Sequence, residues 1–211
     1  MMLDLMSGLG GQSEAFLRDG WSVLRIDNNP LLANVASTVM MPVEFVDPNH
    51  WTDHPAQITY VHASPPCTEF STGFSSPRSI AERSGEDFMP NMKLVMEAIR
   101  IIDTIRPKWW SIENVKGSIR YLRPILGEPR LIVGSFVYWG NFPLFDPKSL
   151  TIPTKSQMDR RHDPLRANHR AHIPLVISEA FLKAMKSQRS LTDFAGIRKN
   201  SHLGQNANVD F

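Results

Sequence analysis

The stretch MLDLMSGLGGQSEAF, residues 2–16, decides the fold that the sequence predicts. Residues 2–5 are typical of a buried strand, and residues 12–20 have the pattern of a helix that ends at a glycine. The turn between them contains Gly8, Gly10 and Gly11. Glycines at such a turn let the backbone bend tightly and approach a ligand closely. The stretch therefore indicates the first strand, turn and helix of an α/β sheet, with a ligand site or an ordinary glycine-rich turn between them.

The same alternation of apolar runs and helical patterns continues along the first half of the chain. Further strands are expected at 22–26, 43–46, 58–63 and 109–112. Helices are expected at 31–40 and 92–106. This rhythm predicts an α/β fold with a mostly parallel, doubly wound sheet. Beyond residue 120 we expect one or two strands within 130–139, a loop rich in Pro and Ser from residue 141, and a helix at 173–185.

The length and composition describe one ordinary domain. The chain has 211 residues, which is enough to bury a core. We expect a single domain over 1–186 and a polar, mobile tail over 187–211. No apolar run has the length that a membrane span needs, and no secretory signal precedes the first strand. With one cysteine, the chain forms no internal disulfide, so we expect a reducing compartment, the cytoplasm or a nucleoid within it.

Positive charge is concentrated near the C-terminus. Residues 148–202 contain 11 Lys or Arg and 4 Asp or Glu, a surplus of 11 − 4 = 7 in a chain whose net charge is +2. A basic segment on an acidic body indicates an anionic partner, for which phosphate is the obvious candidate, or else a solvated charged face.

Acidic residues follow the second and third predicted strands. Asp27 ends the second strand, in RIDNNP, where a carboxylate can accept hydrogen bonds from ribose hydroxyls or cap the next helix. Asp47 follows the third strand and precedes Pro48, so a contact with a base and a role in a turn are both open for it. Together with the glycine turn, Asp27 indicates a cofactor that contains a nucleoside.

The only cysteine lies in ASPPCTEFS, residues 63–71, directly after the fourth predicted strand. Pro65 and Pro66 restrict the backbone before Cys67 and so fix the direction of its thiol. A nucleophile needs such alignment, whereas a buried structural cysteine does not. Glu113 and Asn114 follow the next strand, and the ends of neighbouring parallel strands meet at one edge of a sheet. Glu113 is therefore expected beside Cys67, where a buried glutamate can hold or donate a proton. Taken alone, Glu113 and Asn114 fit the start of a helix at least as well.

The motifs DLMSGLGG, IDNNP, SPPCTEFS and ENV, in this order and spacing, resemble those of the DNA cytosine-5 methyltransferase family over residues 1–140. The resemblance implies a Rossmann-like fold that binds S-adenosylmethionine and needs no metal. It also implies that Cys67 attacks C6 of cytosine, that Glu113 binds N3 and the exocyclic amine, and that C5 takes the methyl group. Because the base is hidden in a stacked duplex, it would be flipped out, and residues 71–84 would form the mobile loop that closes over it.

The resemblance assigns a role to each candidate residue. The catalytic residues would be Cys67, Glu113 and Arg130. The cofactor-binding residues would be Met6, Gly8, Gly10, Gly11, Asp27, Asn28, Asp47 and Pro65. The substrate-binding residues would be Pro66, Ser71, Asn114, Arg161 and Arg166. The stretch IPLVISEAF, residues 173–181, resembles the last family motif, which packs against the cofactor.

Three features depart from the family pattern. Met6 stands where an aromatic residue usually contacts the adenine. Only Arg130 represents the arginines of the eighth motif, so the cluster at 159–170 would supply the others. Residues 141–172 leave room for only a reduced recognition segment, so sequence reading is minimal or comes from the basic loop, a dimer mate or another protein.

Two other functions stay open beside DNA cytosine-5 methylation. The same chemistry on a free cytosine nucleotide needs no recognition domain. A non-catalytic, cofactor-binding partner subunit is the second alternative, and the presence of both Cys67 and Glu113 argues against it.

Overall fold

The computed structural model describes residues 1–51, 57–152 and 162–188. Seven strands form one sheet in the order β3-β2-β1-β4-β5-β7-β6. The strands are β1 (Met2–Leu5), β2 (Val23–Asp27), β3 (Thr38–Met40), β4 (Tyr60–Ala63), β5 (Trp109–Val115), β6 (Leu131–Val133) and β7 (Phe136–Asn141). The first five run parallel to one another, whereas β7 is antiparallel to both β5 and β6.

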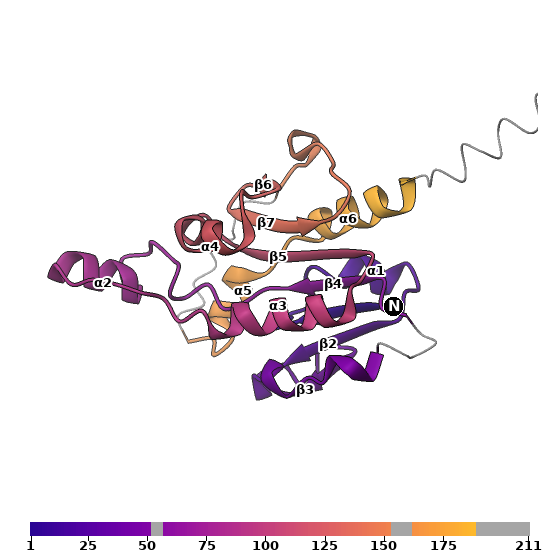
Figure 1. The fold of residues 1–211 in the computed structure, drawn as a ribbon, viewed down its shortest axis with the longest axis horizontal. Helices are drawn as coiled ribbons and strands as arrows, with labels where there is room; N and C mark the ends of the chain where they lie inside the picture. The colour runs from indigo at the N-terminus through magenta and orange to yellow at the C-terminus, as the bar shows by residue number, and fades with distance from the viewer. Residues whose placement is uncertain (52–56, 153–161, 189–211) are drawn as a thin grey trace, which may run out of the picture.

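Helices cover both faces of this sheet (Figure 1). On one face, α3 (Lys93–Ile105) buries Ala98, Ile101 and Ile102 against alternate residues of β1, β4 and β5. On the other face, α1 (Glu14–Arg18) and α6 (Leu175–Ser187) pack together over the opposite set of strand residues. The remaining helices are α2 (Pro77–Ser84), α4 (Ile119–Leu126) and α5 (Arg166–Ala171). The predicted α/β fold with a mostly parallel, doubly wound, Rossmann-like sheet is confirmed.

Two predicted elements near the sheet edge are wrong. The segment 31–40 is not a helix: a short 3-10 helix, Pro30–Leu32, is followed by β3, which pairs with β2. The segment 43–46 is not a strand but a 3-10 helix, Val43–Phe45, that follows Pro42. Strand pairing explains both errors. Part of the first segment forms β3, which pairs with the edge of β2, so that edge is no longer open to the second segment.

The segment 71–84, predicted as a loop, contains the helix α2. Ser76 accepts a hydrogen bond from the amide of Ser79, Pro77 occupies the first turn, and Gly85 ends the helix with a φ of 70°. These are ordinary helix start and stop signals. α2 projects from the body on the side where the carboxyl ends of the parallel strands lie (Figure 1).

The C-terminal predictions have mixed outcomes. The region 130–139 forms the hairpin of β6 and β7, and α6 corresponds to the predicted helix at 173–185. The predicted mobile tail lies almost entirely outside the described residues. Among the described helices, none is both long and apolar enough to cross a membrane.

Candidate functional site

A row of buried polar side chains crosses four adjacent strands on the face that α1 and α6 cover. Arg25, Asp4, His62 and Ser111 are register partners, one from each of β2, β1, β4 and β5. Each of these residues is at most 1% exposed. Because side chains alternate along a strand, all four point to the same face. We call this set the polar row.

A second row lies two residues further along the same strands. It consists of Asp27, Met6, Ser64 and Glu113. These residues follow the polar row at the carboxyl edge of the sheet, where open α/β sheets bind their ligands. We call this set the edge row. Sequence reasoning singled out three of its members but not Ser64.

Arg25, in the polar row, holds the glycine turn in place. The Nη2 of Arg25 donates to the carbonyl oxygen of Gly10 at 3.1 Å and to Oε2 of Glu14 at 3.1 Å, and its Nη1 donates to the carbonyl of Ala36 at 2.9 Å. Gly10 has a φ of +73°, and a Cβ there would lie 2.3 Å from Cζ of Arg25. Only glycine satisfies both the left-handed backbone and the space that Arg25 leaves. Sequence reasoning missed Arg25, because a lone arginine inside a strand pattern carries no signal.

Ser13 links Arg25 to Asp4. The Nε of Arg25 donates to Oγ of Ser13 at 2.8 Å, and the Ser13 hydroxyl donates to Oδ2 of Asp4. Burial raises the pKa of Asp4 to about 7, although the Ser13 hydrogen bond and the Arg25 charge both oppose that rise. Oδ1 of Asp4 is buried and has no hydrogen-bond partner among the described residues. The proton that the raised pKa retains lowers the cost of that burial.

Asp27 faces the glycine turn from β2. Its Oδ2 accepts a hydrogen bond from the amide of Gly8 at 2.8 Å, and its Oδ1 accepts one from the amide of Asn29 at 2.9 Å. These bonds connect Asp27 to the glycine turn and to the residue after Asn28. The carboxylate is oriented by two backbone amides and keeps lone pairs that ribose hydroxyls could use.

None of the described contacts of Asp47 connects it to the edge row or to the glycine turn. It is exposed, and its Oδ1 accepts hydrogen bonds at 3.0 Å from both the amide and the side chain of Asn49. These contacts match the turn role that the sequence left open for Asp47.

The loop that carries Cys67 is tied to the end of β5. The side-chain amide of Asn114 donates to the carbonyl oxygen of Pro65 at 3.0 Å, and both residues are buried. Cys67, which is half-buried, accepts hydrogen bonds at its carbonyl from the amides of Phe70 and Ser71, at 3.1 and 2.9 Å. The loop therefore forms a closed turn directly after Cys67.

A close backbone approach adds a second link between the same two segments. A Cβ on Gly117, which follows β5, would lie 2.0 Å from the carbonyl oxygen of Phe70. Glu113 is 7% exposed at the end of β5, in the edge row, and Pro66 is exposed beside Cys67. The structure thus brings Cys67, Asn114 and Glu113 to one edge, together with the glycine turn.

The candidate arginines are scattered. The Nε of Arg130 donates to the carbonyl of Phe142 at 3.0 Å, and its guanidinium lies 5.6 Å from the Phe142 ring. Arg130 directly precedes Leu131, which is level with Glu113 through Tyr138 of β7. Its guanidinium, however, reaches Phe142, which follows the partner of Trp110 near the amino end of β5. The structure does not bring it to Cys67 because its guanidinium turns toward Phe142. Arg166 is exposed on α5, and Arg161 lies outside the described residues.

The segment that follows Arg166 packs on the glycine turn. A Cβ on Gly8 would meet the side chain of Asn168 at 3.5 Å, and a Cβ on Gly11 would lie 2.4 Å from the carbonyl of Ile173. Ser178 on α6 donates to the carbonyl of Gln12 at 2.5 Å. The stretch 173–181 therefore lies against the turn, and Asn168 is a site candidate that the sequence did not mark.

Ser71 begins the segment that leads to α2. Its Oγ accepts a hydrogen bond from the amide of Gly73 at 3.1 Å, and its carbonyl accepts one from the Ser76 hydroxyl at 2.7 Å. These local bonds fix the start of the segment and leave its tip exposed at Phe74.

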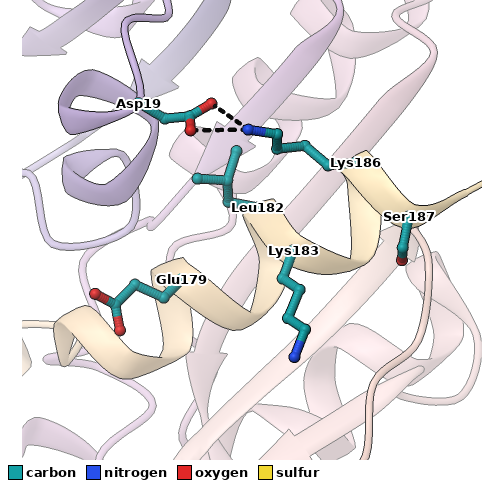
Figure 2. A pocket seen from close by; sticks show the side chains of 6 residues that line it. All are labelled: Asp19, Glu179, Leu182, Lys183, Lys186 and Ser187. Carbon is teal, nitrogen blue, oxygen red and sulfur yellow. Dashed lines mark hydrogen bonds and ion pairs between the residues drawn. The ribbon is translucent and has the colours of Figure 1, made fainter.

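One other feature of the described residues is a hollow on the surface. An open hollow along α6 is lined by mixed charges, among which Lys186 pairs with Asp19 at 2.9 Å (Figure 2). This pair joins the end of α1 to the end of α6. In the described ranges, no three His, Cys, Asp or Glu side chains are grouped closely enough to hold a metal ion.

Comparisons with known proteins point in one direction. A family model described as C-5 cytosine-specific DNA methylase matches residues 1–121. A search of curated proteins found no match.

Solved structures similar to this chain include a protein described as a DNA modification methyltransferase encoded within a prophage (E. coli), with 17% identity and a TM-score of 0.44 over 66% of this chain and 45% of that one. The S. pombe Dnmt2 methyltransferase has 19% identity and a TM-score of 0.37 over 55% and 36% of the two chains. A Spodoptera frugiperda DNMT2 mutant has 19% identity and a TM-score of 0.39 over 66% and 48%. The chain thus spans less than half the length of these structures.

The polar row makes a prediction about the pH dependence of stability. Burial raises the pKa of Asp4 from 3.8 to about 7 and lowers the pKa of His62 from 6.5 to about 3. The Asp4 contribution to the free energy of unfolding is lost as pH rises through about 4 to 7, and the His62 contribution is lost as pH falls from about 6.5. The two slopes therefore oppose each other. In Asp4→Asn the His62 slope remains alone, so the free energy of unfolding should rise more steeply with pH between about 4 and 6.5.

Urea denaturation at a series of pH values measures this slope. Asp103→Asn, on the exposed side of α3, is the matched control and should keep the wild-type profile. Equal slopes for wild type and Asp4→Asn would show that Asp4 is not protonated in the folded protein.

Proposed function

Because the chain belongs to the C-5 cytosine-specific DNA methylase family, whose model matches 121 of its 211 residues, we propose that it transfers a methyl group from S-adenosylmethionine to C5 of cytosine in DNA. One observation carries the proposal: the 3.0 Å hydrogen bond from Asn114 to Pro65. It ties the loop of the only cysteine to the strand end that carries Glu113, at the same sheet edge as the glycine turn.

The residues at that edge fit S-adenosylmethionine. Gly8 and Gly10 let the backbone turn with positive φ, and Asp27 presents an oriented carboxylate beside them. We assign the ribose hydroxyls to Asp27, with Asn28, Pro65 and Met6 lining the same region. When bound, the cofactor supplies an electrophilic methyl group on a positively charged sulfur.

Catalysis begins with Cys67. Its thiolate forms a bond to C6 of cytosine, and the electron pair of the C5–C6 double bond moves to C5. Glu113, buried at the end of β5, holds N3 and the exocyclic amine and so stabilises the charge that the attack creates. C5 would form its bond to the methyl carbon while the bond from that carbon to the cofactor sulfur breaks, and C5 would then lose its proton to solvent. The returning electron pair restores the double bond as the bond from sulfur to C6 breaks.

The substrate side of the site is built from the loop and the basic C-terminal region. Pro66, Ser71 and Asn114 surround Cys67 in sequence or by contact, and we assign them to the flipped base. Arg166 is exposed on α5, beside the segment that packs on the glycine turn, and we assign it to a DNA phosphate.

We propose a single catalytic domain over 1–186 that acts in the cytoplasm. Its segment 141–172 is short for reading a DNA sequence, so we propose that a second copy of the chain or a partner protein supplies most of that recognition.

Methyl transfer tests the function directly. Duplex DNA incubated with the protein and tritiated S-adenosylmethionine should gain label at cytosine C5. Cys67→Ser should lose turnover and keep its affinity for the cofactor within a few fold, because the thiol forms the bond to C6 and does not hold the cofactor. Ser187→Ala, at the end of α6, is the control and should match wild type.

Each other outcome changes the conclusion. Label on free cytosine nucleotides alone would replace DNA as the substrate. Cofactor binding without transfer to any substrate would identify a non-catalytic subunit. Full activity in Cys67→Ser would exclude the covalent route.

The assignment of Arg166 predicts a change in salt dependence. The logarithm of the DNA association constant should fall linearly with the logarithm of salt concentration. Arg166→Ala should reduce that slope by about 1, because one phosphate contact is lost. Lys183→Ala, on the exposed face of α6 seen in Figure 2, is the charge-matched control. An unchanged slope in Arg166→Ala would remove this residue from the DNA contact.

A further inference from the structure

A chain of hydrogen bonds runs through the buried face of the sheet and ends at Ser64. The side-chain amide of Gln12 donates to the Tyr60 hydroxyl at 3.3 Å. Tyr60 and Ser111 are joined at 2.6 Å, Ser111 and Nδ1 of His62 at 2.7 Å, and Nε2 of His62 and Ser64 at 2.8 Å. The Tyr138 hydroxyl anchors the far end by donating to Oε1 of Gln12 at 3.2 Å.

The hydrogen bonds from Gln12 to Ser64 all donate in the same direction. The Gln12 amide can only donate, so the Tyr60 hydroxyl accepts there and gives its own proton to Ser111. Ser111 then donates a hydrogen bond to Nδ1 of His62, so the single proton of the neutral ring is on Nε2. The pKa of His62, lowered to about 3 by burial, keeps the ring neutral, so this arrangement does not change at physiological pH.

The direction of these hydrogen bonds determines what the Ser64 hydroxyl can donate to. Its oxygen accepts a hydrogen bond from the Nε2–H group of His62. The hydroxyl proton of Ser64 is therefore left to donate to a ligand. Ser64 is half-buried and stands in the edge row between Met6 and Glu113. Its amide donates to the carbonyl of Leu5 at 3.1 Å, which places it directly beside the start of the glycine turn.

We propose that Ser64 is a binding residue of this site and that its hydroxyl, oriented by His62 and Ser111, donates a hydrogen bond to an oxygen atom of the methyl donor held at the glycine turn. This proposal rests on the proposed function for the identity of the ligand. The polar chain behind Ser64 acts as a positioning element, because it fixes the direction of the donor before the ligand arrives and so lowers the entropy lost on binding.

The orientation can be measured without any ligand. Nitrogen-15 NMR of the histidine rings distinguishes a proton on Nε2 from one on Nδ1. Wild-type His62 should show the neutral ring with its proton on Nε2 throughout the range from about pH 5.5 to 8. Tyr60→Phe removes the proton that Ser111 accepts, and the ring should then populate both tautomers. A wild-type ring protonated on Nδ1 would overturn the proposed direction.

The contact with the ligand is tested by binding. Calorimetry with S-adenosylmethionine should give a dissociation constant about three- to tenfold higher for Ser64→Ala than for wild type, the loss expected for one hydrogen bond. Ser64→Thr retains a hydroxyl and should recover most of the affinity. Ser187→Ala should bind as wild type does.

The outcomes separate the two proposals. If wild type binds the cofactor and Ser64→Ala binds it equally well, Ser64 is not a binding residue, and the proposed function is untouched. If wild type fails to bind S-adenosylmethionine, the proposed function is contradicted and the ligand assigned to Ser64 falls with it. If Ser64→Ala also has a lowered melting temperature, Ser64→Thr decides the matter: the proposal requires it to recover most of the wild-type affinity, and an affinity as low as that of Ser64→Ala would overturn it.

Discussion

The structure depends on the burial of polar groups beneath the carboxyl edge of its sheet. Arg25, Asp4, His62 and Ser111 lie side by side across four strands with almost no access to water. Buried polar groups are costly unless they find partners, and Arg25 and His62 find some of theirs in the loops at the carboxyl edge. Arg25 binds the carbonyl of Gly10, and His62 binds Ser64. The requirement for pairing therefore sets the positions of the two loops that form the candidate site.

The arrangement of the strands converts this requirement into a site. Because β1, β4 and β5 are parallel neighbours, the glycine turn, the Cys67 loop and Glu113 reach the same edge although they are distant in sequence. Asn114 and Gly117 then fasten the Cys67 loop to the end of β5. The Cys67 thiol is thus carried on a loop and Glu113 on the end of β5, and the rigid sheet determines their spacing. A thiol, a carboxylate and a cofactor turn in this arrangement suit methyl transfer to an unsaturated carbon of a base.

Much of this could be predicted from the sequence, for identifiable reasons. The first strand, the glycine turn and the helix that follows have strong local signals, and the ends of β4 and β5 could be placed by the usual adjacency of parallel strands.

The error at 31–40 arose because apolar residues there allow a helix, whereas pairing with β2 favours a strand. The motif match did not show to which side the Arg130 side chain turns, and its guanidinium contacts Phe142. His62 and Ser64 were missed because a histidine in a strand and a serine directly after it look ordinary until the register places His62 between Asp4 and Ser111.

The central claim is that Cys67 forms a bond to the base during methyl transfer. A duplex that contains 5-fluorocytosine tests it most directly, because fluorine at C5 cannot leave as a proton does and the adduct cannot resolve. With S-adenosylmethionine present, we predict a stable complex of protein and DNA, and mass spectrometry of its peptides should place the DNA on Cys67 and an added methyl group on the base. A protein that methylates ordinary DNA and yet forms no such complex, or forms it at another residue, would contradict the account.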